Sequence, residues 1–536
     1  MSARWTRRHL LHTGLSGLTL AGCGRVSSAY FGNTLPPERD ILRVGNAAEP
    51  RSLDPHKVEG ALGELNLCMA LFDGLSEYHP RTLVPQPALA LGWYPENQAR
   101  RWIFKLRPGV RWNDGTACSA QDFVYSWRRA LDPATGCPYA NLLYYLKNGR
   151  AINEGKLPTA ALGVSAPDPL TLRVEMEGPV AFFPLITSFF IFRPVPEQAI
   201  VAHGDEWTRP GKLVTNGAFT LAHHRPYDEI RLLRSPTYWD RSNVRLAEAV
   251  LLPIVEGAQN VNLYLTGELD VTVGGVLPRP LLPELRRYRD FRADGRFITY
   301  YLSFNCSRSP FDRSAVRTLL GSAIERDELA RRYLKGDAVA ATSFIPPGIP
   351  GYTSPGSAPA SPPRRSFLER FTIHCANREP DRTVAAVLQS RWKQQLGAAP
   401  QVSTEELQTF LARIRRHDYD VAVTRWGGDY LDPTTFLDLY DGLAPKNYPG
   451  WDDSLYRQLL AVARREGDPQ QRYHLLARAE ARLLAEAPIW PLFHTGLEYL
   501  QKPWLTGWEP NLQDLHPLKY VAIDRSWHSP FNASSG

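Results

Sequence analysis

The sequence predicts an α/β protein with mixed β-sheets, and three observations lead to that class. The 536 residues, 43% hydrophobic and 22% charged, describe a soluble globular chain with room for two or more domains. The first half contains a hairpin-like alternation of apolar and polar residues, and the second half alternates strand-like with helical segments. Because hairpins give antiparallel strands and strand–helix alternation gives parallel ones, both kinds of pairing are expected.

The hairpin pattern covers residues 101–116, where large apolar residues alternate on one face up to a turn signal at 113–115. A helix should follow, because Ser119 and Asp122 have the spacing of a capping box. That helix should end before Asp132, since a residue that precedes proline disfavours the helical conformation.

The second half supplies the alternating elements. Its expected strands are 298–305, 419–426 and 489–494, and its expected helices are 314–336, closed by Gly336, then 381–397, 452–465 and 469–486. Between them, residues 345–365 are rich in Pro and Ser and should form an extended, mobile loop.

The first 22 residues resemble a bacterial lipoprotein signal peptide. A basic start and a weakly apolar middle lead into Cys23, which would become the acylated first residue. The start also carries adjacent arginines, so export by the general or by the twin-arginine route stays open. Residues 23–40 would then be a flexible, lipid-anchored tether, and the protein would lie in the periplasm or cell envelope. Without the three arginines of the signal, the net charge falls from +7 to +4, too little to indicate nucleic-acid binding.

No pattern indicates a metal site, a cofactor or an enzyme. The cysteines beyond Cys23 lack CxxC spacing, so structural zinc is not expected, while disulfide pairing stays open. The motifs HExxH, Walker A and GxGxxG are absent. The best candidate for a further membrane segment, residues 180–192, is short and interrupted by proline, so we expect a buried core element there.

One carboxylate stands out in the stretch TRWGGDYLDPTTF, residues 424–436. Asp429 comes just after a strand and after Gly427-Gly428, which should bring the backbone close to a neighbour and free its dihedral angles. Strand ends are the usual place for ligands in open α/β sheets. Asp432 already fits the N-cap of the next helix, which weakens the case for Asp429 as a capping residue.

The natural ion-pair partner of Asp429 is missing from this stretch. By strand alternation Arg425 points away from Trp426, which argues against Arg425 as that partner. Since an unpaired buried carboxylate is costly, a ligand cation would be a sensible partner. A plain turn role and a catalytic-acid role for Asp429 stay open on these residues alone.

Several stretches in consistent order between residues 41 and 525 resemble the oligopeptide-binding proteins of bacterial peptide ABC transporters, which are extracellular solute-binding proteins of family 5. They include SLDPHKVEG (52–60), LFDGLSEY (71–78), WIFKLRPGVRWNDGTACSAQDFVYSWRRALDP (102–133), VTNGAFTL (214–221), RSPTYWD (234–240), PFDRSAVRTLL (310–320) and the stretch around Asp429.

The resemblance implies a two-lobed clam-shell, the type II periplasmic-binding-protein fold with mixed sheets and an extra inserted domain. The implied domains are a discontinuous domain I, an inserted domain II and a domain III that forms the second lobe, with the bounds 41–61, 191–296 and 496–525 for domain I, 62–190 for domain II and 297–495 for domain III.

The resemblance also implies a binding site between the lobes. Asp429 matches the family's anchor for the peptide α-ammonium, and Glu49 matches a position that lines the cleft from the first lobe. Cleft-lining aromatics match Tyr139 and Trp426. The ligand backbone would pair with the strand that ends at Gly427, through Val423, Thr424, Arg425 and Trp426.

Some features of the family are missing. Val423, Ile414 and Asp381 stand where relatives carry basic residues for the peptide C-terminus, and Ile298 and Gly427 stand where some carry a disulfide. Arg413, Arg415, Arg416 or His417 could receive the C-terminus or form a solvated basic face. The usual helix before residues 371–379 is deleted or replaced, so peptide length and sequence preference stay open.

The expected function is that of a lipid-anchored, monomeric receptor that captures short peptides and delivers them to an ABC transporter permease, without bond chemistry, cofactor, metal or nucleic acid. Three alternatives stay open. The first is a receptor of the same fold for another solute, such as an oligosaccharide or a metal chelate, and the second serves wall-peptide recycling or sensing. The third is an enzyme, for example a glycosidase that uses Asp429 and Glu49.

Overall fold

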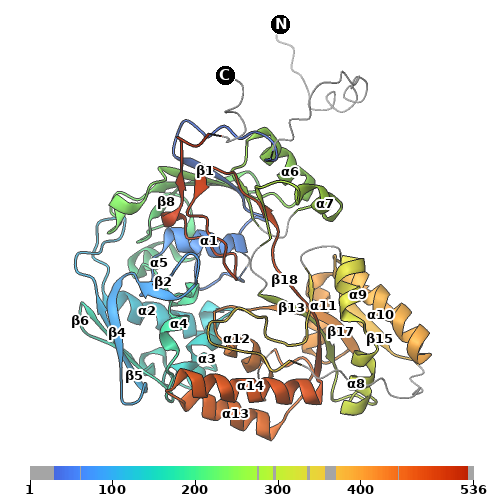
Figure 1. The fold of residues 1–536 in the computed structure, drawn as a ribbon. Helices are drawn as coiled ribbons and strands as arrows, with labels where there is room; N and C mark the ends of the chain where they lie inside the picture. The colour runs from blue at the N-terminus through green and yellow to red at the C-terminus, as the bar shows by residue number, and fades with distance from the viewer. Residues whose placement is uncertain are drawn as a thin grey trace, which may run out of the picture.

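The computed structural model describes residues 29–60, 62–273, 277–293, 297–334, 338–356, 370–442, 444 and 446–528. The predicted signal peptide (1–22), the lipidation residue Cys23 and the helix-ending Gly336 lie outside the described residues. Three large sheets occupy separate parts of the molecule, around β1 and β8, around β4 to β6, and around β13 and β17 (Figure 1). Two of them mix parallel with antiparallel strands, so the predicted α/β class with mixed sheets is confirmed.

The first sheet has the order β11-β1-β10-β9-β8. β1 runs parallel to β10 and β11, whereas β9 is antiparallel to both of its neighbours. The sheet and the elements beside it are β1 (Ile41–Gly45), β8 (Phe219–Arg225), β9 (Glu229–Arg234), β10 (Glu248–Leu252), β11 (Val271–Thr272), α6 (Gly257–Thr266), α7 (Leu282–Leu285) and the paired short strands β12 (Phe291–Arg292) and β19 (Tyr499–Leu500).

The second sheet, β4-β5-β7-β6, is antiparallel. Its strands are β4 (Ala90–Glu96), β5 (Arg101–Leu106), β6 (Val164–Asp168) and β7 (Thr171–Glu175). The hairpin predicted over 101–116 is wrong in its partner, because β5 pairs with β4 and β7, and the turn at 113–115 closes only an isolated bridge. The chain reverses earlier, at 97–99, where three successive residues adopt positive φ.

Helix α2 (Ala120–Leu131) confirms the prediction at both of its ends. The Ser119 hydroxyl accepts the N–H of Gln121, and the Asp122 carboxylate accepts the N–H of Ser119 at 2.7 Å, so the capping box is present. The helix ends at Leu131, just before Asp132-Pro133. Around it lie α1 (Leu62–Leu71), α3 (Gly149–Asn153), α4 (Phe183–Ile186) and α5 (Glu197–His203).

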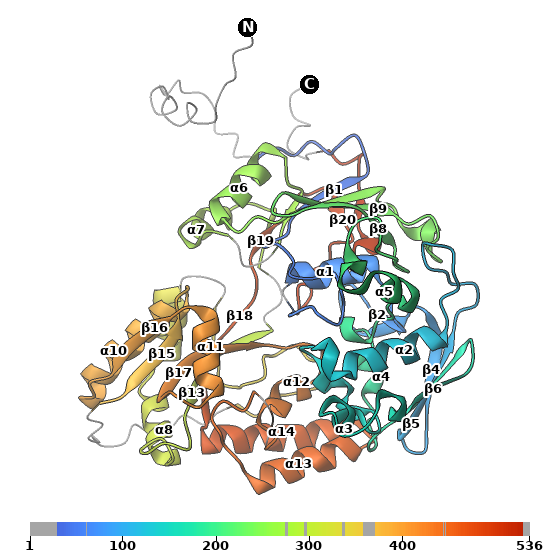
Figure 2. The ribbon, with the colours of Figure 1, turned by 180° about the vertical axis from the view of Figure 1, so that it is seen from behind.

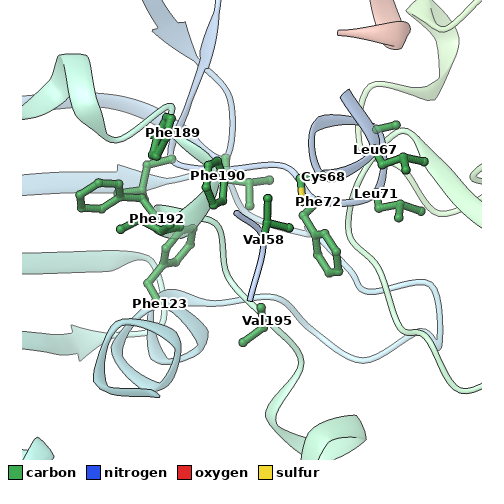
Figure 3. Close-up of a cluster of buried hydrophobic side chains, with 14 of the residues drawn as sticks. Val58, Leu67, Cys68, Leu71, Phe72, Phe123, Phe189, Phe190, Phe192 and Val195 are labelled. Carbon is green, nitrogen blue, oxygen red and sulfur yellow. The ribbon is translucent and has the colours of Figure 1, made fainter. Parts of the chain in front are cut away.

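A cluster rich in phenylalanine joins α1 and α2 to residues 189–195. Figure 3 shows Phe123 of α2 near Phe192 and Phe190, with side chains of α1 beyond them. These rings are almost inaccessible to solvent. The apolar run 180–192 is thus a buried core segment, as predicted, and in the part of the chain that the structure describes no helix has the length and apolar character needed to span a membrane.

The third sheet has the order β14-β18-β13-β17-β15-β16, in which β15 runs parallel to β16 and β17 and the other pairs are antiparallel. The strands predicted over 298–305, 419–426 and 489–494 and the helices predicted over 381–397, 452–465 and 469–486 are found with small shifts in their bounds. The elements of the region are β13 (Ile298–Phe304), β14 (Val339–Ala340), β15 (Thr372–Ala376), β16 (Gln401–Glu405), β17 (Val421–Gly427), β18 (Ile489–Thr495), α8 (Ser314–Ser322), α9 (Arg326–Glu328), α10 (Asp381–Leu396), α11 (Leu407–Arg415), α12 (Thr434–Leu437), α13 (Ser454–Arg465) and α14 (Pro469–Glu486).

Helices cover both faces of this sheet, which explains why its strands are apolar on both sides. Val421 and Val423 of β17 pack with α8 and α10, whereas Ala422 packs with α11 on the opposite face. Helices α13 and α14 lie side by side below (Figure 2). The single helix predicted over 314–336 is wrong, because the chain leaves the helical conformation between α8 and α9 and continues as a π-helical turn, Leu329–Leu334.

Two connections join the third sheet to the rest of the molecule. One leads from β12 into β13, and the other leads from β18 into β19, which pairs with β12. The two crossings therefore begin or end side by side at β12 and β19, as in a hinge between two lobes.

The described part of the predicted tether is packed against the protein. The N–H of Phe31 donates to the Asp290 carboxylate at 3.0 Å, and the N–H of Asn33 donates to the Leu265 carbonyl at 2.9 Å. The Phe31 ring also lies 5.2 Å from the Tyr288 ring. Within the tether predicted over residues 23–40, Phe31 and Asn33 therefore contact the region of α6 and α7.

Candidate functional site

The end of β17 carries the stretch singled out in the sequence. Across the strand Gly427 is the partner of Ile298, and the N–H of Gly428 donates to the Phe297 carbonyl at 3.0 Å. A Cβ atom on Gly428 would overlap the Phe297 ring. Neither glycine has a positive φ, so the predicted need for free dihedral angles is wrong. Close approach is the reason for glycine at position 428, whereas a Cβ on Gly427 would make an ordinary contact with Ile298.

One edge of β17 is open where the site begins. β13 pairs with β17 along its whole length, but β15 pairs with it only at Val421 and Ala422. Residues Val423 to Gly427 therefore present a strand edge without a strand partner in the described part of the chain. Such an edge can accept an extended ligand by main-chain hydrogen bonds.

The loop after β17 is held through its backbone. The N–H of Asp429 donates to the Thr435 hydroxyl at 2.8 Å, and the indole N–H of Trp426 donates to the Thr435 carbonyl at 2.8 Å. The Gln513 amide donates to the Gly428 carbonyl at 2.8 Å. Within the described residues, no hydrogen bond and no ion pair within 4.0 Å engages the Asp429 carboxylate itself, so the loop presents that group without neutralising it.

A lysine and two aromatic rings complete the site. The Lys446 ammonium lies 4.2 Å from the centre of the Trp426 ring and 5.4 Å from the centre of the Tyr139 ring. Tyr139 rests on the rings of Phe189 and Phe190. Tyr139, Trp426, Asp429 and Lys446 thus come together from distant parts of the sequence, and all four side chains are half-buried.

The charges of these groups act on one another. Burial raises the pKa of the Asp429 carboxyl to about 6, and the positive charge of Lys446 opposes that rise. Burial lowers the pKa of Lys446, and the negative charge of Asp429 opposes that fall. Burial and then the charge of Asp429 hold the pKa of Tyr139 well above its ordinary value. The site therefore solvates the isolated Asp429 carboxylate poorly, and an added cation would stabilise the ionised form.

We expect Asp429→Asn to stabilise the ligand-free protein at neutral pH. The carboxyl pKa rises from 3.8 to about 6 on folding, so the ionised group opposes folding. The stability present below pH 4 is lost as the pH rises through 6. Because water still reaches the group, we expect a gain of about 1–2 kcal/mol at pH 7.5 and almost none at pH 4. Urea unfolding of both ligand-free proteins measures this, and an equal or lower stability of the variant at pH 7.5 would contradict the expected cost.

The other predicted residues lie in varied surroundings. Val423 and Thr424 are buried side chains of β17. Arg425 is exposed, and its guanidinium donates to the Tyr300 hydroxyl at 3.2 Å. Glu49 accepts the N–H of Tyr227 at 3.0 Å and contacts the His224 Nε2 at 2.6 Å. Glu49 is thus already engaged by the β8–β9 hairpin.

The basic residues considered for a ligand C-terminus are partly occupied. Arg413 forms ion pairs with Glu405 at 2.7 Å and with Asp418 at 2.6 Å, and His417 Nδ1 contacts the Tyr448 carbonyl at 2.9 Å. Arg413 is therefore neutralised within α11 and its neighbours, which favours the solvated-face alternative for that residue.

Sequence reasoning missed Lys446, Thr435 and Gln513. Lys446 lies in an irregular loop without periodicity, and Gln513 reaches the site from 85 residues beyond Gly428. Thr435 alone had a signal, because it lies in the stretch around Asp429 that the sequence singles out.

No metal or disulfide chemistry is present in what the structure describes. The described residues contain no group of three or more His, Cys, Asp or Glu side chains that could hold a metal ion. The described cysteines Cys68, Cys118, Cys137, Cys306 and Cys375 are free. The disulfide pairing that the sequence left open is therefore not found among them.

Comparisons with known proteins agree with this architecture. The chain is 32% identical to the periplasmic oligopeptide-binding protein OppA of Escherichia coli (strain K12), over 94% of this chain and 96% of OppA. It is 30% identical to the probable deoxycholate-binding periplasmic protein YgiS of the same organism, over 89% of this chain and 92% of YgiS. The crystal structure of Haemophilus influenzae OppA in complex with RPPGFSPFR is similar, with a TM-score of 0.79 and 28% identity, over 91% of this chain and 99% of that one.

A family assignment follows from these matches. The sequence profile named bacterial extracellular solute-binding proteins, family 5 Middle, matches residues 84–448, and the relatives named above are binding proteins. The match runs from the β4 region through the open edge of β17 to the Lys446 loop. This chain belongs to the bacterial extracellular solute-binding proteins of family 5.

Proposed function

We propose that this protein is an extracytoplasmic receptor that captures short peptides between its two lobes and delivers them to an ABC transporter permease. The observation that carries this proposal is the Asp429 carboxylate. It lies half-buried and its charge acts on Tyr139 and Lys446, and among the described residues no hydrogen bond or ion pair within 4.0 Å engages it. A peptide α-ammonium is a cation that fits such a group.

The open edge of β17 supports an extended ligand. A peptide whose ammonium lies at Asp429 would run along Val423 to Gly427 and pair with their backbone groups, as an added strand. Main-chain pairing does not depend on the ligand's side chains, so selectivity for sequence would be low. Glu49 would line the cleft from the first lobe, where the β8–β9 hairpin holds its carboxylate.

The domain division 41–61 with 191–296 and 496–525, 62–190 and 297–495 accords with the sheets and with the paired crossings between them. Binding would close the two lobes by a hinge motion at these crossings, and the permease would recognise the closed form. No group transfer is part of this proposal, and the receptor would act as a monomer.

We further propose that Cys23 is lipidated and holds the protein at the outer face of a membrane. The carbonyl of Ala29 already accepts the N–H of Arg289 at 2.8 Å. Six residue steps from Cys23 to Ala29 span at most about 20 Å. So short a tether would hold the face with α6 and α7 close to the lipid surface.

A receptor of the same fold for another solute is the second candidate. The observation that favours it is the similarity to a probable deoxycholate-binding protein, together with a lysine in the site that could pair with an acidic ligand. Such a ligand carries no ammonium, so its affinity would not depend on the Asp429 charge.

The test is to identify what the protein carries and what it binds. We expect the chain from Arg25 onward, unfolded after purification, to release a mixture of short peptides detectable by mass spectrometry. The refolded protein should bind trialanine in a calorimetric titration and should bind N-acetyl-trialanine much more weakly. A single non-peptide compound in the released fraction, together with no heat from trialanine, would contradict peptide binding and favour the second candidate.

A further inference from the structure

Lys446 places a cation against two aromatic rings of the candidate site. Its ammonium stands over Trp426 at 4.2 Å and over Tyr139 at 5.4 Å, both within the range of cation–π attraction. The loop that carries it is shaped by its own backbone, since the N–H of Asn447 donates to the Ala444 carbonyl at 2.9 Å. The lysine ammonium lies against both rings, so Lys446 is not a free surface side chain.

Asp429 is the carboxylate whose charge acts on Lys446. In the described part of the chain no Asp or Glu oxygen lies within 4.0 Å of its ammonium, and the negative charge that acts on it is that of Asp429. The positive charge of Arg415 acts in the opposite sense. Lys446 and Asp429 thus form a loose pair across the aromatic rings, close enough to interact and too far apart for a direct salt bridge.

A loose pair of this kind can be displaced by a ligand. A peptide ammonium brought to Asp429 would add a second positive charge beside Lys446 in a half-buried site, and two like charges there repel each other. Lys446 must then leave the rings for solvent. Its long, flexible stem allows that movement, whereas the β17 strand end and the Thr435 contact keep Asp429 in place.

We propose that Lys446 is a tethered competitor for the α-ammonium subsite at Asp429 and sets how strongly the receptor distinguishes ligands with a free amino terminus from ligands without one. This inference rests on the proposed function. In the empty protein Lys446 partly neutralises Asp429. A free peptide must displace the lysine, whereas a ligand without a positive charge can bind with the lysine in place. Lys446 therefore weakens the binding of free peptides selectively.

The experiment compares trialanine with N-acetyl-trialanine on four refolded, ligand-free proteins, by calorimetric titration at low salt and pH 7.5. The proteins are the wild type, Lys446→Met, Lys446→Arg and Asp429→Asn. We expect Lys446→Met to bind trialanine roughly ten-fold more tightly and to leave the affinity for the acetylated peptide nearly unchanged. Lys446→Arg keeps the cation over the rings and should behave as the wild type.

The outcomes separate the inference from the function on which it rests. If Lys446→Met binds trialanine no more tightly than the wild type while Asp429→Asn still loses binding, the inference is overturned and the ammonium anchor stands. A weaker trialanine affinity in Lys446→Met also overturns it, because the lysine would then contact the ligand favourably. If no variant and no wild type binds trialanine, the proposed function itself has failed. Thermal midpoints of Lys446→Met and Lys446→Arg equal to that of the wild type exclude misfolding as the cause of any difference.

Discussion

Asp429→Asn is expected to weaken the binding of trialanine by roughly ten- to hundred-fold. Asparagine keeps the shape of the side chain and its contacts, but it removes the charge that would receive the peptide ammonium. A hydrogen bond to a charged group contributes about 1.5–3 kcal/mol, and 1.4 kcal/mol corresponds to a factor of ten in affinity. Titration of ligand-free wild type and variant with trialanine measures the loss.

Two comparisons make this prediction specific to the anchor. N-acetyl-trialanine carries no ammonium, so both proteins should bind it with similar, weak affinity. Asp452→Asn is a matched control in the same lobe, because Asp452 lies on the surface in an ion pair with Arg457, and it should leave trialanine binding unchanged. If Asp429→Asn binds trialanine as tightly as the wild type does, Asp429 is a turn residue and does not anchor the peptide ammonium.

Asp429→Asn should thus lose binding while it gains stability in the empty protein. The opposite signs have one cause, since the desolvation that raises the carboxyl pKa to about 6 is the cost that a ligand cation would offset. A residue kept only for the turn would not show this opposition. Measuring both quantities on one pair of proteins therefore tests the role of Asp429 more strictly than either does alone.

Patterns among neighbouring residues predicted the helices and strands that depend on those residues alone. Ser119 and Asp122 lie three residues apart and cap α2, and the alternation around β17 follows from its own residues. The hairpin over 101–116 was wrong because β5 pairs with β4, which directly precedes it, and with β7, which lies about 65 residues further on, and the turn signal at 113–115 indicates neither partner. The packing of Phe31 on α6 likewise depends on residues more than 200 positions away.

Some residues of the candidate site are likewise indicated by a local pattern, and others are not. Asp429 and Trp426 stand in one short stretch, so strand alternation and a family resemblance could indicate them. Lys446 shares the site but lies in a loop without periodicity, and no pattern relates it to Asp429. For Glu49 the resemblance gave a cleft position, whereas its contact with His224 joins residues 175 positions apart. Sequence patterns do not predict which charged side chains of a binding site meet through tertiary structure alone.

The largest effect on stability is expected from Arg472→Met. Arg472 of α14 forms a two-pronged ion pair with Asp432, at 2.6 and 2.8 Å, and the Asp432 side chain is inaccessible to solvent. The guanidinium also lies 4.3 Å from the Phe182 ring, so the pair touches the core around residues 180–192 as well. Removing one partner of such a pair leaves a buried carboxylate unpaired, which lowers the free energy of unfolding by about 3–5 kcal/mol.

Urea unfolding of Arg472→Met against Arg482→Met checks this prediction. Arg482 lies on the same helix, but its pair with Asp453 is partly exposed, so its loss should cost about 1 kcal/mol or less. The double variant Arg472→Met with Asp432→Asn should regain much of the stability, because no unpaired charge remains. Equal costs for Arg472→Met and Arg482→Met would contradict the assignment.

The same pair should matter for binding, although neither residue is placed in contact with ligand. Asp432 also accepts the N–H of Thr434 at 3.0 Å, and Thr435 follows with its hydroxyl on the N–H of Asp429. The Arg472–Asp432 pair therefore fixes the loop that presents the Asp429 carboxylate to the open edge of β17. Loosening this loop should lower trialanine affinity under conditions where Arg472→Met is still folded, whereas Arg482→Met should bind as the wild type does. A buried ion pair far from solvent would then hold a second, half-buried carboxylate in position for its ligand.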